Sequence, residues 1–311
     1  MSHALRPAAR LLAAAVAVIL SGIAGTSAAN AACAAAISDF GPTPVITYDP
    51  FEGILRTVDV TVRFVNGGAD PCTLAVAVGS RTPGALRQFT HGADSLAYRV
   101  KAPGGAEFLN DLTAPMGAVF LEGGVGKQAS LTFRVEVPAG LIAPTGSYDD
   151  LLTVRAYDVT AAPVRLGLDR TAAGVAVIPA RAQVNLAGAS GGFGGTFGLD
   201  RIDFGILQVG ETRNAFVQVR ATSPVTITVS SANRGLLRHD VLKEQVGGVA
   251  YALSLDGQPA ALAGGPYALD RSPPITLDGI SYPLALRITG PLAGLPAGVY
   301  KDTLTVDVVP R

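Results

Sequence analysis

The chain has 311 residues, with 24 basic and 24 acidic side chains, 37 glycines, two cysteines and no tryptophan. Arg6 and Arg10 are the only charged residues before residue 32, so the remainder carries 22 basic and 24 acidic residues and a net charge of −2. A charge this close to zero argues against nucleic acid or an anionic membrane surface as a partner.

The first 31 residues have the pattern of a bacterial export signal. Two arginines precede an apolar stretch at residues 11–23, and residues 29–31 (Ala-Asn-Ala) fit a signal peptidase site. The apolar stretch is shorter than the roughly 20 residues that span a bilayer as a helix, which disfavours an anchor. Lipid attachment at Cys33 is disfavoured because residues 30–32 lack the leucine of a lipoprotein signal. Removal of residues 1–31 leaves 280 residues, enough for two domains.

Cys33 and Cys72 are the two cysteines of the chain. Because exported proteins fold in an oxidising compartment, a disulfide between them is predicted rather than two free thiols. The bond closes a loop of about 40 residues, which is worth roughly 3–4 kcal/mol in lost chain entropy of the unfolded state.

Alternating apolar and polar residues recur along the chain. They occupy residues 58–65, 129–137, 216–220 and 225–229, and glycine, proline, asparagine and aspartate separate them. Period-two alternation is typical of an antiparallel β-sandwich, and no long segment has the spacing of an amphipathic helix. The predicted fold class is all-β.

An internal duplication divides the chain. The motif G-x-Y-x-D-x-L-T-V stands at residues 146–154 and again at residues 298–306. Three weaker markers precede it in both halves: Phe-Gly at 40–41 and 204–205, Gly-x-Leu-Arg at 84–87 and 235–238, and Ala-Tyr at 97–98 and 250–251. The predicted domains are residues 32–187 and 188–311, with the glycine-rich residues 188–198 as a flexible connector.

Both cysteines fall in the first copy. Counting back from the Phe-Gly markers aligns Cys33 with Phe197, and the Pro-Cys and Pro-Val pairs align Cys72 with Val225. The disulfide of the first copy is therefore predicted to be replaced in the second by an apolar pair, whose burial recovers a few kcal/mol.

At these residues the chain resembles the spore coat protein U domain family. The resemblance covers both copies and depends above all on the closing G-x-Y-x-D-x-L-T-V motif; the absence of cysteines from the second copy departs from the family pattern. The family supplies subunits of archaic chaperone–usher pili as well as secreted coat proteins, and its two-domain members resemble pilus tip adhesins. The resemblance implies two immunoglobulin-like, pilin-type sandwiches that take their last strand from a partner by β-strand addition.

The two copies are expected to differ in that last strand. After Tyr148 the first copy continues into residues 175–186, which are predicted to supply its last strand, whereas only eleven residues follow Tyr300. The second sandwich is therefore predicted to lack its last strand. The groove left open is expected to be lined by Leu304, Val306, Val308 and Phe204.

The expected function is that of a pilus tip subunit and adhesin, and the alternative is a secreted coat or matrix protein. A mature chain that begins one residue before Cys33 has no segment to donate to a neighbour, which favours the tip over the shaft. The partners implied are a periplasmic pilus chaperone, an outer-membrane usher, an adjacent pilus subunit and a surface or receptor. The protein is expected in the periplasm during assembly and then at the cell surface.

Adhesion is expected in the first copy, because the second is committed to accepting a strand. Two segments of the first copy, residues 42–51 and 109–120, are unusually apolar for loops. Exposed apolar patches often mark interaction sites, although both segments are also compatible with core strands. The candidate adhesive residues are Val45, Ile46, Tyr48, Leu112 and Met116.

No enzyme activity, metal or cofactor is expected. Residues 188–192 match G-x-S-x-G around Ser190, but a nucleophile elbow needs a helix after the serine, and this one lies in a glycine run. His91 and His239 lie in different copies, with no further ligands at metal-binding spacing.

Two further residue types belong to the repeated motif itself. Asp150 recurs as Asp302, which indicates a turn rather than half of a catalytic carboxylate pair with Asp149. Tyr148 recurs as Tyr300, which indicates a buried architectural tyrosine rather than a ligand contact.

Overall fold

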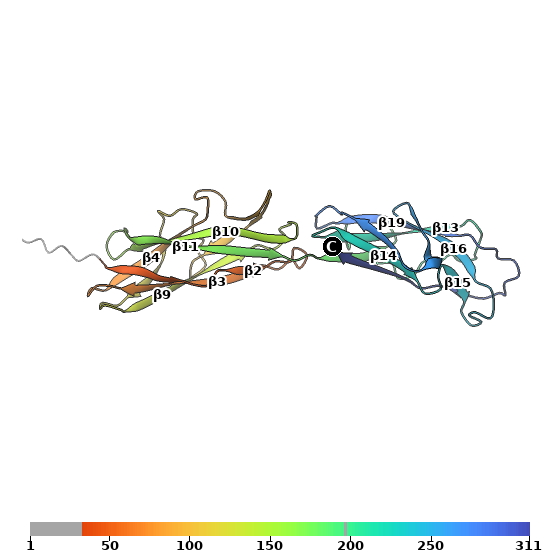
Figure 1. The fold of residues 1–311 in the computed structure, drawn as a ribbon, viewed down its shortest axis with the longest axis horizontal. Helices are drawn as coiled ribbons and strands as arrows, with labels where there is room; N and C mark the ends of the chain where they lie inside the picture. The colour runs from red at the N-terminus through yellow and green to blue at the C-terminus, as the bar shows by residue number, and fades with distance from the viewer. Residues whose placement is uncertain (1–32, 196–197) are drawn as a thin grey trace, which may run out of the picture. The chain divides into compact units, whose positions relative to one another are not determined.

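The computed structural model describes residues 33–195 and 198–311, which fold into β-strands and one short 3-10 turn, Leu262–Gly264 (Figure 1). The predicted all-β fold is confirmed. Two separate clusters of buried apolar side chains, one within residues 33–178 and one within residues 204–288, mark two sandwiches. The described ranges contain no helix long and apolar enough to cross a membrane. The predicted export signal lies outside the described residues.

The first sandwich consists of two sheets. One has the strand order β1 (Ala35–Phe40), β3 (Arg56–Asn66), β9 (Gln128–Val137), β7 (Arg99–Lys101). The other has the order β2 (Val45–Thr47), β11 (Val164–Ile178), β10 (Gly146–Asp158), β4 (Cys72–Gly79), β8 (Met116–Leu121), with β5 (Gln88–His91) on β10 and β6 (Asp94–Ala97) on β5. All pairs in this sandwich are antiparallel except β2 with β11, which is parallel.

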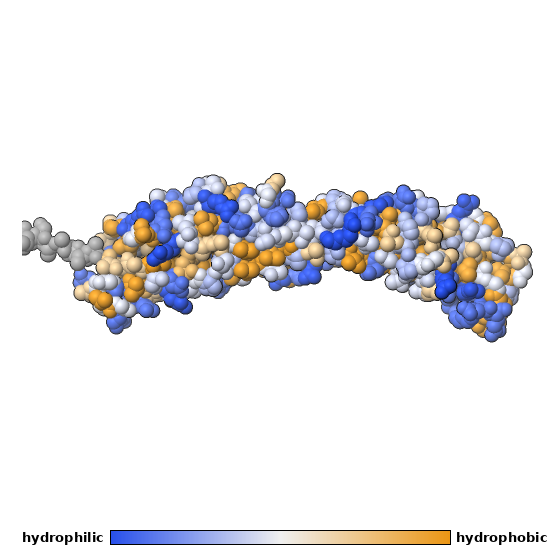
Figure 2. Space-filling model, in the orientation of Figure 1, coloured by the Kyte–Doolittle hydropathy of each residue, from blue (hydrophilic) through white to orange (hydrophobic). Residues whose placement is uncertain are grey.

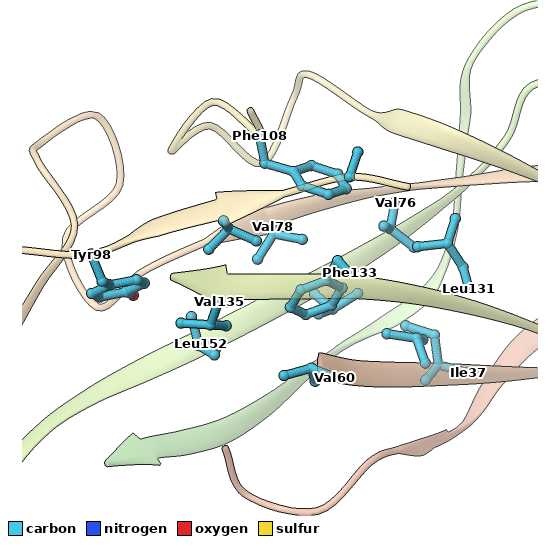
Figure 3. Close-up of a cluster of buried hydrophobic side chains, with 14 of the residues drawn as sticks. Ile37, Val60, Val76, Val78, Tyr98, Phe108, Leu131, Phe133, Val135 and Leu152 are labelled. Carbon is cyan, nitrogen blue, oxygen red and sulfur yellow. The ribbon is translucent and has the colours of Figure 1, made fainter. Parts of the chain in front are cut away.

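The core of the first sandwich follows from the period-two alternation of its strands. Figure 3 shows Val60 of β3 and Phe133 of β9 meeting Val76 and Leu152 from the opposite sheet, and all four are buried. Each fully buried side chain of this kind contributes about 1.5–3 kcal/mol. The alternate positions of β3 and β9, such as Asp59, Arg63 and Arg134, face water.

The predicted disulfide between Cys33 and Cys72 is confirmed. Both cysteines are buried, and their Cα atoms lie 5.8 Å apart. Cys33 precedes β1 in one sheet and Cys72 begins β4 in the other, so the bond ties the two sheets of the first sandwich together.

Replacing both cysteines by serine is expected to lower the stability of the first sandwich by about 3–4 kcal/mol, because the unfolded chain regains the entropy of the closed loop. Calorimetry should show a lower Tm for one transition only, since the second sandwich contains no cysteine. Two reactive thiols in the denatured, unreduced wild-type protein would contradict the pairing.

The second sandwich repeats this architecture with fewer strands. Its larger sheet has the order β12 (Ala182–Ala187), β13 (Thr212–Ala221), β19 (Ile280–Ile288), β16 (Val249–Leu255), β15 (Leu236–His239), β20 (Tyr300–Lys301), with β17 (Gln258–Ala260) on β16. Its smaller sheet has the order β18 (Tyr267–Arg271), β14 (Val225–Ser231), β21 (Leu304–Pro310).

The boundary between the sandwiches differs from the predicted one. Residues 175–186 were expected to form a single strand of the first sandwich, but β11 ends at Ile178 and β12 pairs with β13 of the second sandwich. Pro179 follows β11 directly and has no N–H for a ladder, which separates the apolar run into two strands. The boundary therefore lies at residues 179–181 rather than after residue 187.

The glycine-rich stretch consequently belongs to the second sandwich and does not connect the two. The N–H of Phe193 donates to the carbonyl of Asp278 at 2.8 Å, and the N–H of Gly191 donates to the hydroxyl of Ser281 at 3.2 Å. These bonds fix the described part of the stretch against the beginning of β19.

Candidate strand-acceptor groove

Strand β21 is the counterpart of β10. The hydroxyls of Tyr148 and Tyr300 each donate to the proline carbonyl four residues earlier, at 2.8 and 2.9 Å. At the other end, the N–H of Val159 donates to the carbonyl of Thr73 in β4, and the N–H of Arg311 donates to that of Pro224 just before β14, both at 2.8 Å. Corresponding residues in the two copies of this strand are therefore 152 positions apart.

The two strands differ in their neighbours. β10 pairs with β11 along one edge and with β4 along the other. β21 pairs with β14, and within residues 33–195 and 198–311 no strand pairs with its second edge. Figure 1 shows β21, in dark blue, running beside β14. The backbone N–H and C=O groups of that second edge are open to pairing with another chain.

The side chains of β10 are also more deeply buried than those of β21. Leu152, Val154 and Ala156 of β10 have exposed fractions of 0%, 0% and 1%. Their counterparts in β21, Leu304, Val306 and Val308, are only partly buried. Leucine and valine recur at the first two of these positions, and Val308 is larger than its counterpart Ala156. The missing neighbour strand, not the chemistry of β21, therefore leaves its apolar face incompletely covered.

An open groove of about 810 Å³ lies beside β21. Its lining comes from both sheets and from the connection between β12 and β13, and it combines apolar residues with the polar or charged Asp200, Arg201, Asp203, Lys301, Asp302 and Thr303. The apolar lining residues are Leu186, Leu199, Ile202, Phe204, Leu207, Ala215, Leu237, Tyr251, Leu284, Leu286, Val299, Tyr300, Leu304 and Val306. Of the four predicted groove residues, Phe204, Leu304 and Val306 line this space, whereas Val308 packs against the core.

A tyrosine–aspartate pair stands at the same place in each sandwich. Tyr98 donates its hydroxyl to Asp150 at 2.6 Å, and Tyr251 donates to Asp302 at 2.5 Å. Burial raises the pKa of both tyrosines, and the hydrogen bond to the carboxylate raises it further, so both hydroxyls stay protonated as donors.

The aspartate of the motif also fixes the local backbone. The other carboxylate oxygen of Asp150 accepts the N–H groups of Arg81 and Leu151, and that of Asp302 accepts those of Asn233 and Thr303. The carboxylate thus fixes the turn beside its own strand in both copies.

The two histidines correspond to each other, which the sequence markers did not reveal. His91 contacts the ring of Tyr148, and His239 contacts that of Tyr300, with centroids 5.4 and 5.2 Å apart. A Cβ atom on Gly298 would lie 2.2 Å from Nε2 of His239, so the glycine of the closing motif makes room for the imidazole ring. Both histidines are part of the strand-end packing.

The Gly-x-Leu-Arg marker proves misaligned. The N–H of Tyr98 donates to the carbonyl of Arg87, and the N–H of Tyr251 donates to that of Gly235, both at 3.1 Å. Arg87 therefore corresponds to Gly235 and not to Arg238. Its guanidinium is buried and donates to backbone carbonyls, including that of Phe108 at 2.6 Å.

The Phe-Gly marker is also not equivalent in the two copies. Phe40 ends strand β1, whereas Phe204 lies outside the described strands, in the connection between β12 and β13.

The predicted replacement for Cys72 is displaced by two residues. Leu74 pairs with Asp158 and Val225 pairs with Pro310, at corresponding positions of β10 and β21. Val225 is thus the counterpart of Leu74 and not of Cys72. Phe197, aligned with Cys33, lies outside the described residues.

The candidate adhesive residues divide into buried and exposed ones. Ile46 and Tyr48 are buried, and the Tyr48 hydroxyl donates to the carbonyl of Leu141 at 3.0 Å, so the expectation that these two form an exposed loop is wrong. Val45, the outward residue of β2, is 56% exposed. Leu112 and Met116 are partly buried.

Two exposed leucines of the first sandwich were not among the predicted contacts. Leu86 and Leu109 are 81% and 63% exposed and lie on adjacent loops. Figure 2 shows that hydrophobic areas, in orange, are interspersed with hydrophilic ones, in blue, on the face in view. The amide of Asn110 clamps these loops by donating to the carbonyl of Ala85 at 2.8 Å. This hydrogen bond fixes the two loops that carry the exposed leucines.

Ser190 follows β12 and is succeeded by turns over residues 191–195, not by a helix. A nucleophile elbow requires a strand, a sharp turn and then a helix. The described residues therefore do not give the G-x-S-x-G match its catalytic setting.

No family model matches the chain, and no curated protein matches it. Among solved structures, it is similar to a chain of the CsuC–CsuE chaperone–tip adhesion subunit pre-assembly complex from archaic chaperone–usher Csu pili of Acinetobacter baumannii. The identity is 14%, over 88% of this chain and 99% of that chain, with a TM-score of 0.48. It is also similar to the CupB6 tip adhesin of Pseudomonas aeruginosa, at 14% identity over 88% of this chain and 94% of that chain, with a TM-score of 0.38. CfaE, the adhesive subunit of CFA/I fimbria of enterotoxigenic Escherichia coli, is 11% identical over 88% of this chain and 94% of its own, with a TM-score of 0.34.

Proposed function

We propose that this protein is an adhesive subunit of a surface pilus whose second sandwich is completed by a β-strand from a partner. The observation that carries the proposal is the difference between two copies of one fold. β10 is covered by β11, whereas the matching edge of β21 faces an open apolar groove. An inserted strand satisfies the unpaired backbone groups and covers the apolar lining in one step.

The class of partner follows from the resemblance of the closing motif to spore coat protein U domains. Subunits of archaic chaperone–usher pili take the missing strand from a periplasmic chaperone and later, at the outer-membrane usher, from an adjacent subunit. We assign the groove to these partners in turn, and the position at the pilus tip to the two-domain architecture. The Cys33–Cys72 disulfide fits assembly in an oxidising compartment.

The adhesive surface is assigned to the first sandwich, which has its own last strand. Its exposed apolar side chains include Val45, Leu86 and Leu109. Held on a folded scaffold, such side chains offer a contact to an apolar receptor or surface.

The proposal is tested by placing charge in the groove. Replacing Leu304 and Val306 together by aspartate should abolish surface display of the protein and cell attachment in the native bacterium, because a donated strand can no longer cover β21. Val309 is 50% exposed on the same strand, so Val309→Asp is the matched control and should leave both unchanged. Immunolabelling of whole cells and an attachment assay give the two readouts.

The purified double variant should remain folded by circular dichroism, because its new carboxylates face the open groove and stay solvated. A folded double variant that is still displayed on pili would overturn the proposal. Equal display of wild type and double variant in a secreted layer without fibres would favour the coat-protein function instead.

A further inference from the structure

The two corresponding histidines use their imidazole rings in different ways. His91 is exposed, and its Nδ1 lies 3.0 Å from the carbonyl oxygen of Ser147, which accepts a hydrogen bond. His239 is buried, and its Nδ1 accepts the backbone N–H groups of Val241 at 3.2 Å and Leu242 at 3.1 Å. A ring nitrogen that faces a carbonyl carries a proton, whereas one that faces two N–H donors carries none.

The hydrogen bonds of His239 therefore assign one protonation state to its ring. Nδ1 has no proton, and Nε2 lies 3.3 Å from the carbonyl oxygen of Ala297, so the proton is on Nε2. Gly298 leaves room for this contact. The imidazole is neutral, and it connects the end of β15 with the chain that enters β20.

The ring also fixes a turn beside the groove. Besides the two bonds to Nδ1, the carbonyl of His239 accepts the N–H of Lys243 at 2.9 Å, which closes the turn at residues 240–243. The N–H of Asp240 in this turn donates to the carbonyl of Val299 at 2.8 Å. Because Val299 and Tyr300 line the groove, the turn supports the rim of the groove at this end.

The charged groups that the structure describes around the ring are engaged elsewhere. The Asp240 carboxylate is ion-paired with Lys301 at 2.9 Å and with Lys243 at 3.7 Å. The hydrogen bond from Lys301 lowers the pKa of Asp240, so this pair stays ionised in mild acid. Arg238, the neighbour in β15, is a cation, and Glu244 is exposed. No carboxylate within the described ranges hydrogen-bonds the imidazole ring.

The titratable groups of the closing motif are engaged as well. The ring of Tyr300 packs against the imidazole, and its hydroxyl donates to the carbonyl of Pro296 at 2.9 Å. The carboxylate of Asp302 accepts the hydroxyl of Tyr251 and the N–H of Asn233. A proton added to Nδ1 of the imidazole would therefore meet two N–H donors and no anion.

We propose that His239 makes the rim of the groove sensitive to acid: its neutral ring holds the turn at residues 240–243, and a protonated ring releases that turn. This inference builds on the proposed acceptor function, because it concerns the rim beside which an inserted strand would lie. An imidazolium ion has a proton on both nitrogens and cannot accept the N–H groups of Val241 and Leu242. The stability that His239 contributes is thus complete above about pH 6.5, where an ordinary histidine titrates, and is lost as the pH falls below it.

Hydrogen exchange of the whole chain, followed by mass spectrometry at about pH 7.5 and about pH 5, tests the inference. After correction for the intrinsic effect of pH on amide exchange, residues 238–246 and 298–303 should open at least about 10-fold more often at the lower pH. The limit is about 30-fold, the ratio of protonated to neutral histidine at pH 5 when it titrates near pH 6.5. Residues 88–95 and 146–151 should not change, because the Nδ1 proton of His91 keeps its bond when Nε2 is protonated.

His239→Asn is the variant that separates this ring from other titrating groups. The Oδ1 atom of asparagine can accept the same N–H groups and does not titrate, so residues 238–246 should exchange alike at the two pH values. His91→Asn is the matched control and should keep the wild-type response. Independently of any variant, nitrogen-15 NMR of the wild-type protein should show Nδ1 of His239 without a proton at about pH 7.5.

Unchanged exchange of residues 238–246 at about pH 5 in the wild-type protein, or a proton on Nδ1 of His239 at about pH 7.5, would overturn the inference. A response to acid that persists in His239→Asn would overturn it as well, because it would belong to another group. These measurements are made without an inserted strand. The acceptor function therefore stands or falls separately, with the double variant of Leu304 and Val306.

Discussion

Repeating residues 159–178 after Pro310 is expected to stabilise the second sandwich by about 5 kcal/mol, because the added strand buries Leu304, Val306 and Val308 fully. These three side chains gain about 1 kcal/mol each on going from partial to full burial. New backbone hydrogen bonds add about 1 kcal/mol each, and the entropy of ordering the added strand offsets part of the gain.

The register of this extension is fixed by the chain itself. Val159 and Arg311 make the same backbone hydrogen bond at the end of β10 and β21, so the added hairpin continues from β21 as its original continues from β10. Calorimetry should show one transition raised by about 15 °C and the transition of the first sandwich unchanged.

The control extension has the same length but carries aspartate in place of Ala172, Ala176 and Ile178. Residues Ala176 and Ile178 are buried in β11, so their charged replacements cannot enter the groove without a large desolvation cost. This chain should melt like the unextended protein. An equal gain from both extensions would show that the groove does not receive the strand.

The closing motif was predictable because its tyrosine, aspartate and glycine each make a structural contact that requires a fixed spacing. The tyrosine bonds a carbonyl four residues back, the aspartate fixes a turn, and the glycine makes room for a histidine ring. None of these contacts tolerates insertion or deletion between the letters, so the motif survives in both copies with identical spacing.

The alignment of Cys72 with Val225 failed for a reason that follows from strand geometry. A slip of two residues keeps every side chain on the same face, so a match such as Pro-Cys with Pro-Val looks equally good in either register. Only the ladder hydrogen bonds distinguish Leu74 from Cys72 as the counterpart of Val225. The correspondence of His91 with His239 was hidden because it depends on pairing partners that lie far away in the sequence.

The sequence predicted the groove residues on β21 but not those on the opposite side of the groove. Apolar alternation identified Leu304 and Val306, but Ile202 and Leu237 lie in segments without a clear pattern. Their role depends on a comparison with β2 and β5, which requires the fold of the first sandwich.

One substitution is expected to have opposite effects at two equivalent sites. In the first sandwich, Gly174 of β11 is buried, and a Cβ atom there would lie 3.0 Å from Cε1 of Phe89. Gly174→Leu should therefore overpack the core and destabilise the first sandwich by about 2 kcal/mol.

In the strand added after Pro310, the copy of Gly174 faces a different neighbour. Gln88 pairs with Ala97 and Leu236 with Ala250, so Leu237 occupies the place of Phe89. Leu237 is only partly buried and lines the open groove. Leucine at the repeated glycine should fill that space and stabilise the second sandwich by about 2 kcal/mol.

The stability changes of the two sandwiches should differ by about 4 kcal/mol. Calorimetry of the chain extended after Pro310 measures both, because each substitution shifts the transition of its own sandwich. Alanine at each site is the graded control, with smaller shifts of the same signs. Destabilisation by leucine at both sites would mean that the second groove is as narrow as the space beneath β11. The expected result instead implies a groove that selects a strand with bulkier inward residues than the chain's own β11, because a smaller side chain stands where Phe89 fills the first sandwich.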